Sequence, residues 1–90
     1  MTNQLETLRQ EIDSIDAQIF GLFEQRITVA KQIGAYKKEH ELAVLDFSRE
    51  DAKRDQVKAS VSNELEPYAL ELFEVLMKAA KAVQETPREL

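Results

Sequence analysis

Arg26 interrupts an otherwise apolar helical stripe, and its position raises the first question about chemistry. Between residues 5 and 33, apolar residues recur every three or four positions, as on one face of a helix, and Arg26 replaces one of them. Burying an unpaired guanidinium costs several kcal/mol. Arg26 therefore pairs with a carboxylate such as Asp16 or Glu50, extends its head to solvent, or faces a cavity that binds an anion.

Other polar residues occupy similarly unexpected positions. Lys37 follows Arg26 by about three helical turns on roughly the same face, and Gln84 lies on the apolar face of a later helix. Arg49 opens a further helix, where the helix dipole disfavours a cation, so it needs a carboxylate or a ligand. Taken singly, Lys37 also suits a solvated surface, and a frayed last turn would expose Gln84 harmlessly. Taken together, these residues favour an anion-binding cavity.

Two acidic residues and a distant arginine complete the candidate set. Glu50, in a first turn, complements the helix dipole, and Asp46 suits a helix cap or a loop hydrogen bond. Arg9 precedes Arg26 by roughly 25 Å along a helix, so one small ligand cannot contact both residues within one chain. In an antiparallel dimer, Arg9 of one chain would reach the Arg26 region of the other. On its own, Arg9 is typical of a solvated surface charge.

The chain lacks the residues that most covalent and metal-dependent reactions use. It has no cysteine, and His40 is its single histidine, which disfavours disulfides and zinc. Neither a nucleophile paired with a base nor a glycine-rich phosphate loop is present. We therefore expect no metal site, and any reaction to depend on positioning and electrostatics.

Composition and charge narrow the structural class. Ninety residues make one small domain, here residues 1–90, and abundant helix-forming residues with two glycines and two prolines predict an all-α fold. A formal net charge of −5 argues against a nucleic-acid or membrane-surface partner. The sequence has neither a signal-peptide-like apolar run nor a stretch approaching a membrane span, which suits a cytoplasmic protein.

Periodicity predicts three helices: a long one over residues 4–38, a short one over 49–61 and a medium one over 67–84 or 85. Gly34 gives the only hint of a break in the first, and the helix is expected to continue through it. Ser48 and Asp51 resemble a capping box for the second. Residues 62–66 are expected to form a loop, and Pro67 suits the first turn of the third helix. Pro87 should end that helix, and the residues after it should form a frayed tail.

The long helix would measure roughly 50 Å, whereas a compact chain of this size has a radius of gyration near about 12 Å. Most of its apolar stripe cannot be covered by the remaining residues of one chain. The pattern therefore predicts a symmetric dimer in which two long helices pack together. The alternative is a long solvated helix in a monomer.

The order and spacing of these residues resemble the all-helical (AroQ-type) chorismate mutases. The resemblance rests on the segments LRQEIDSIDAQIFGLFEQR, IGAYK and VLDFSRE, followed by Gln84 in the last helix. It implies an intertwined helical homodimer of three-helix chains, in which each of two sites receives an arginine from the other chain. It also implies a cofactor-free rearrangement of chorismate to prephenate, in the synthesis of phenylalanine and tyrosine.

The resemblance also implies a role for each matching residue. Arg26 and Arg9 of the other chain would bind the two substrate carboxylates, helped by Arg49. Lys37 and Gln84 would donate hydrogen bonds to the ether oxygen, where negative charge grows as the C–O bond breaks. Of the two acidic residues, Glu50 and the region of Asp46 would receive the substrate hydroxyl.

Three positions depart from the family pattern. Ala80 replaces a serine that would bond a carboxylate, and Lys81 and Lys53 replace apolar wall residues. Each lysine projects to solvent or, in the case of Lys81, compensates for the missing hydroxyl.

Two other functions remain open: isochorismate pyruvate lyase, which shares the fold, and a non-catalytic regulatory or interaction module. Some relatives associate with another shikimate-pathway enzyme, so such a partner is possible.

Overall fold

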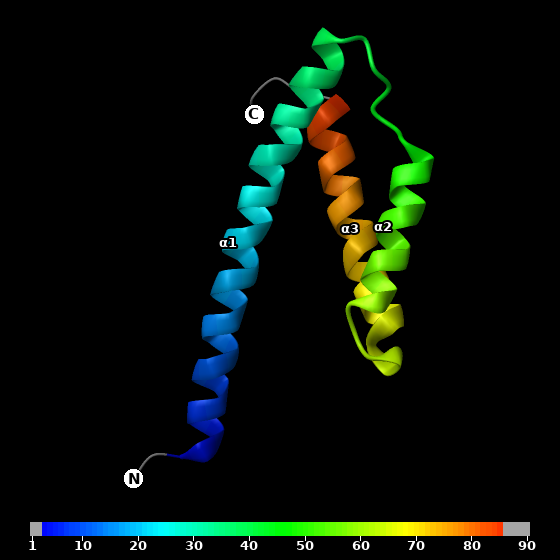
Figure 1. Ribbon diagram of the computed structural model, residues 1–90. Helices are drawn as coiled ribbons and strands as arrows, with labels where there is room; N and C mark the ends of the chain where they lie inside the picture. The colour runs from blue at the N-terminus through cyan, green and yellow to red at the C-terminus, as the bar shows by residue number, and fades with distance from the viewer. Residues whose placement is uncertain (1–2, 86–90) are drawn as a thin grey trace.

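The computed structural model describes residues 3–85, and within them the chain is entirely helical without strands. The long helix α1 spans Gln4–Glu39, the short helix α2 spans Phe47–Ala59, and α3 spans Glu66–Glu85 after a single 3-10 turn, η1, at Asn63–Leu65 (Figure 1). The prediction of an all-α fold with long, short and medium helices is confirmed. The stop predicted at Pro87 and the tail after it lie outside the described residues.

Hydrogen bonds cap the helix α1 at both ends. The Asn3 side chain accepts a hydrogen bond from the backbone N–H of Leu5 at 2.8 Å. At the other end, Glu41 adopts a left-handed conformation with φ of 55°, and the N–H of Leu42 donates to the carbonyl of Lys37 at 2.7 Å. This is a Schellman-type ending, which satisfies the last carbonyls and redirects the chain into residues 42–46.

Gly34 has a packing role that its sequence position did not indicate. The residue is buried inside an unbroken α1, and a Cβ added there would lie 2.8 Å from the Cα of Gln84. The absence of a side chain therefore permits α3 to approach α1 closely at this level. The one glycine that hinted at a break is instead the contact point that brings Gln84 to α1.

The predicted start of α2 was wrong by two residues. Asp46, rather than Ser48, is the N-cap: its carboxylate accepts hydrogen bonds from the Arg49 backbone N–H at 3.2 Å and the Ser48 hydroxyl at 2.9 Å. Asp51, the other half of the predicted capping box, pairs instead with Arg54 at 3.0 Å. An aspartate before the first turn caps as well as a serine, and here it takes both donors.

A salt-bridge network on Arg54 joins α2 to α3. The Arg54 Nε donates to Glu74 Oε2 at 2.8 Å, and its other nitrogens lie 3.0 Å from Asp51 Oδ1 and 3.7 Å from Glu50 Oε1. The hydrogen bond from Arg54 lowers the pKa of the Glu74 carboxyl, and the same bond raises the pKa of Arg54. These contacts hold the α2 face that carries Glu50 in one orientation relative to α3.

Replacing Glu74 with glutamine is expected to lower the melting temperature near neutral pH. Because folding lowers the pKa of Glu74, its ionised form stabilises the chain above the ordinary value of 4.5, and that contribution disappears as pH falls through the folded value. Thermal unfolding from about pH 7 to about pH 3 should show the variant and the parent chain converging in acid. Glu71→Gln, an exposed α3 site without an ion pair in residues 3–85, is the matched control. An unchanged difference at all pH values would contradict the assignment.

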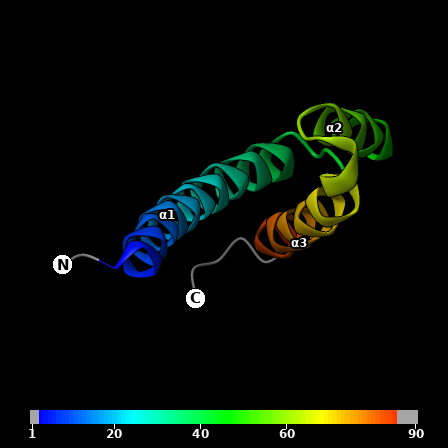
Figure 2. The ribbon, with the colours of Figure 1, turned by 90° about the horizontal axis from the view of Figure 1, so that it is seen from below.

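The chain buries few side chains by itself. Ala30, Gly34 and Phe73 are the buried residues within 3–85, whereas the apolar stripe of α1 remains about half exposed, including Leu5 at 51% and Ile12 at 56%. The amino-terminal half of α1 extends away from α2 and α3 (Figures 1 and 2). The molecule is 61 Å long with a radius of gyration of 16.9 Å, against about 12 Å for a compact chain of this length.

None of the helices in residues 3–85 has the length and hydrophobicity needed to cross a membrane.

Candidate active site

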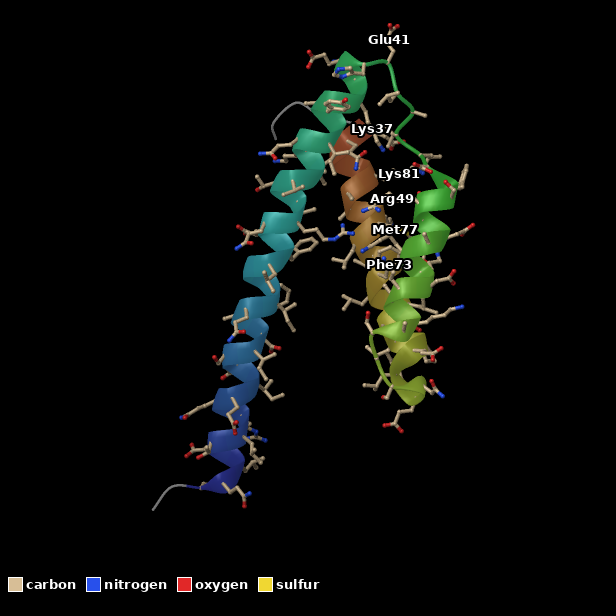
Figure 3. The ribbon with its side chains drawn as sticks, viewed as in Figure 1. Lys37, Glu41, Arg49, Phe73, Met77 and Lys81 are labelled. Carbon is tan, nitrogen blue, oxygen red and sulfur yellow. The ribbon has the colours of Figure 1, made fainter. Side chains whose placement is uncertain are left out.

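A cavity of about 500 Å³ lies between the carboxyl-terminal half of α1, the loop after it, α2 and α3. Its volume is in the range of small-molecule sites. Seven of the eight site residues predicted from sequence line it: Arg26, Lys37, Asp46, Arg49, Glu50, Ala80 and Gln84. The labelled side chains of Lys37, Arg49, Phe73, Met77 and Lys81 lie around this region (Figure 3).

Arg26 is half-buried and has no carboxylate within ion-pair distance in residues 3–85. Its Nη1 donates to the Leu76 carbonyl of α3 at a long 3.4 Å. The pairings with Asp16 or Glu50 considered from sequence are therefore absent, and Glu50 instead faces Arg54. A guanidinium has five N–H donors, so most of those on Arg26 remain for a ligand in the cavity.

Lys37 links α1 to the loop that closes one end of the cavity. Its ammonium donates to the Val44 carbonyl at 2.8 Å, and its own carbonyl accepts the N–H of Leu42. The side chain is half-buried, so the interpretation of Lys37 as a solvated surface charge does not hold. One of three ammonium donors is used, which leaves two that can reach a ligand from a fixed position.

The residues at the start of α2 present both charges to the cavity. Hydrogen bonds from the Arg49 backbone and the Ser48 hydroxyl lower the pKa of Asp46, so this carboxylate is ionised at neutral pH and only accepts hydrogen bonds. Glu50 is held beside Arg54 at 3.7 Å. The guanidinium of Arg49 makes no hydrogen bond or salt bridge within the described part of the chain, although its charge helps to lower the pKa of Asp46. The expectation that Arg49 needs a carboxylate or a ligand stays a prediction.

Gln84 carries the most unusual group at the site. Its Oε1 atom is buried and has no hydrogen-bond partner within residues 3–85. Leaving a buried acceptor without a donor costs about 1–3 kcal/mol, so a donor from a bound molecule would stabilise this group. The Cα, Cβ and Cγ atoms of Gln84 lie against Gly34 of α1, and the residue borders the cavity together with Lys37.

Replacing Gln84 with glutamate is expected to make the rearrangement that the resemblance implies, chorismate to prephenate, depend on acid pH. Glutamine donates a hydrogen bond at any pH, whereas a glutamate donates only when it is protonated. We expect Gln84→Glu to lose at least about a hundredfold in kcat near pH 7 and to recover part of it as the pH falls toward about 5. Rate–pH profiles of both chains test this. A variant profile parallel to that of the parent chain would show that Gln84 does not act as a donor.

Arg9 is the one predicted site residue that the structure does not bring to the cavity. It is exposed in the amino-terminal half of α1 and is absent from the cavity lining. Its separation from Arg26, roughly 25 Å along the same helix, follows from helix geometry. Within one chain, the cavity is therefore built without it, as the sequence argument anticipated.

The cavity also has residues that the list of candidates omitted. Its apolar wall consists of Val29, Ala30, Ile33, Val44, Leu45, Phe73 and Met77. The first three belong to the same stripe as Arg26, so the stripe itself was the available signal. Lys53 and Lys81, noted only as departures, also line the cavity.

Comparison with known proteins agrees with this geometry. A chorismate mutase from Methanocaldococcus jannaschii is 28% identical over 87 residues, covering 94% of this chain and 88% of that protein. A solved structure of a conserved hypothetical protein from Pyrococcus furiosus is 34% identical with a TM-score of 0.71, covering 93% of this chain and 99% of that one. The model of the family "Chorismate mutase type II" matches residues 8–85. The chain therefore belongs to the chorismate mutase type II family, and the resemblance inferred from its motifs is confirmed.

Proposed function

We propose that this enzyme rearranges chorismate to prephenate, the first committed step toward phenylalanine and tyrosine. The observation that carries the proposal is a cavity lined by five cationic side chains and by the amide side chain of Gln84. Such a site suits a small dicarboxylate whose reaction builds negative charge on one oxygen. In the rearrangement, one C–O bond breaks and one C–C bond forms within a single molecule, so no nucleophile or proton transfer is required.

Each polar residue has a role that fits its surroundings. Arg26 binds one carboxylate through donors that the Leu76 carbonyl leaves free, and Arg49 helps to hold a carboxylate from α2. Binding at Arg26 favours the compact substrate conformer in which the reacting carbons approach, which removes an entropic part of the barrier. Asp46 and Glu50 accept the substrate hydroxyl, and Ala80 contributes to the wall.

Lys37 and Gln84 act on the bond that breaks. Hydrogen-bond donors already aimed at an oxygen that gains charge are worth several kcal/mol each, because they need no rearrangement during the reaction. The Val44 carbonyl holds the Lys37 ammonium, and the contact with Gly34 holds Gln84. Both donors are therefore positioned by contacts away from the substrate.

The functional unit in this proposal is a homodimer. The support is the half-exposed apolar stripe on α1, where Leu5, Ile12, Ile19 and Leu22 are each about half exposed or more. Burying such side chains stabilises association by roughly 25 cal/mol per Å² of apolar surface. An antiparallel pairing of the two α1 helices then brings Arg9 of each chain toward the cavity of the other, where it binds the second carboxylate.

Measuring products tests the proposal directly. The purified chain should convert chorismate to prephenate, and it should release little pyruvate when given isochorismate under the same conditions. Pyruvate release in place of prephenate would identify a lyase with this fold instead. Failure to turn over either substrate, together with no binding of a bicyclic dicarboxylate that mimics the transition state, would indicate a non-catalytic module.

A further inference from the structure

The cavity contains more positive charge than its own carboxylates balance. Five cationic side chains line it, Arg26, Lys37, Arg49, Lys53 and Lys81, against Asp46 and Glu50. Asp46 caps α2 and offsets part of the charge of Lys37 and Arg49, whereas Glu50 lies beside Arg54, so the two carboxylates do not balance the five cations. The excess of cations therefore faces whatever occupies the cavity.

Three of the five cations already have protein acceptors. Arg26 donates to the Leu76 carbonyl, Lys37 donates to the Val44 carbonyl, and Lys53 donates along α2 to Gln56 Oε1 at 3.1 Å. The side chains of Arg49 and Lys81 have no acceptor among residues 3–85. They come from different helices, α2 and α3, and border the same cavity (Figure 3).

Within its turn of α3, Lys81 is the side chain at the cavity that can donate a hydrogen bond. Ala80 lines the cavity beside it without a polar side-chain atom, and Gln84 follows one turn later on the same face. Lys78, the preceding lysine of α3, is exposed as Lys81 is, but it does not line the cavity. Lys81 therefore differs from Lys78 in its position at the cavity, and not in its charge.

We propose that Lys81, from α3, and Arg49, from α2, together bind one carboxylate of the substrate. The inference rests on the proposed function, because it requires a dicarboxylate ligand. The charge of a carboxylate changes little between ground state and transition state, so a residue that binds it contributes almost equally to both. Losing that residue raises KM and leaves kcat nearly unchanged.

Steady-state kinetics with chorismate at low ionic strength test the role of Lys81. In Lys81→Met, which keeps the apolar stem and removes the charge, KM should rise about tenfold with kcat within about twofold. Lys81→Arg should stay within about threefold of the parent chain in KM. The matched control, Lys78→Met, should leave both constants unchanged.

A double variant tests whether Lys81 and Arg49 share one carboxylate. The effects of Lys81→Met and Arg49→Met on KM should combine to less than their product, because the second change removes a partner already weakened by the first. Fully multiplicative effects would mean that the two cations bind separate groups, which overturns the shared arrangement.

The outcomes separate this inference from the proposed function. If the parent chain makes prephenate and Lys81→Met has a KM within about twofold of it, only the inference fails. If the parent chain does not turn over chorismate, the proposed function fails, and calorimetric titration with the bicyclic dicarboxylate decides the inference. Equal affinities of the parent chain and Lys81→Met in that titration would overturn it.

Discussion

Replacing Arg26 with methionine is expected to lower kcat/KM for chorismate by at least about a hundredfold while the chain remains folded. The guanidinium is half-buried, and its protein acceptor is one carbonyl at 3.4 Å. Methionine fills a similar volume, so the loss of one long hydrogen bond should change the free energy of unfolding by only about 1 kcal/mol. The substrate carboxylate, in contrast, would lose its charged partner.

The comparison needs both activity and stability from the same preparation. Circular dichroism and denaturant unfolding should give near-parent values for Arg26→Met, and Lys31→Met, an exposed cation of α1 outside the cavity, should behave like the parent chain throughout. Unfolding of Arg26→Met would mean that Arg26 is structural. Full activity in a folded variant would remove it from the site.

Replacing Arg9 with alanine is expected to reduce activity to a similar degree, although Arg9 is exposed and distant from the cavity of its own chain. The reason is the proposed pairing of two α1 helices, which places Arg9 beside the second carboxylate in the other chain's cavity. Because the Arg9 side chain makes no hydrogen bond or salt bridge within residues 3–85, its loss should not alter chain stability measurably. Steady-state kinetics together with the molar mass in solution check both parts.

Arg9→Lys is the matched control for charge at this position. A lysine keeps the positive charge but lacks the planar fork that binds a carboxylate through two hydrogen bonds, so intermediate activity is expected. Parent-level activity in dimeric Arg9→Ala would remove Arg9 from the site. A monomeric chain with full activity would contradict the dimer itself.

The helical elements were predictable because their signal is local. The apolar stripe of α1 defined a helix over residues 4–38, against Gln4–Glu39 in the structure, and Pro67 correctly marked the first turn of α3. The start of α2 was misplaced because Asp46 and Ser48 are both good caps two residues apart. Only the backbone geometry decides which side chain accepts the first N–H groups.

The parts of the site that sequence missed depend on contacts between helices. In the sequence, Gly34 looked like a possible break in the helix. Its packing role could not be inferred there, because the residue that it contacts, Gln84, lies fifty residues later in the chain. The hold of the Val44 carbonyl on Lys37 depends on the left-handed Glu41, which redirects the chain after α1 and is not a glycine. For Lys81, the sequence left open whether it projects to solvent or replaces the missing hydroxyl, and the position of α3 places it at the cavity.

The central claim is that each site is completed by two chains, and mixing two inactive variants tests it most directly. Arg9→Ala and Arg26→Ala chains, unfolded and refolded together in equal amounts, should form heterodimers in about half of all dimers. Each heterodimer has one site with both arginines and one site with neither. The account therefore predicts recovery of about one quarter of the parent activity, from two preparations that are each nearly inactive. Confirmed heterodimers with no recovered activity would contradict it.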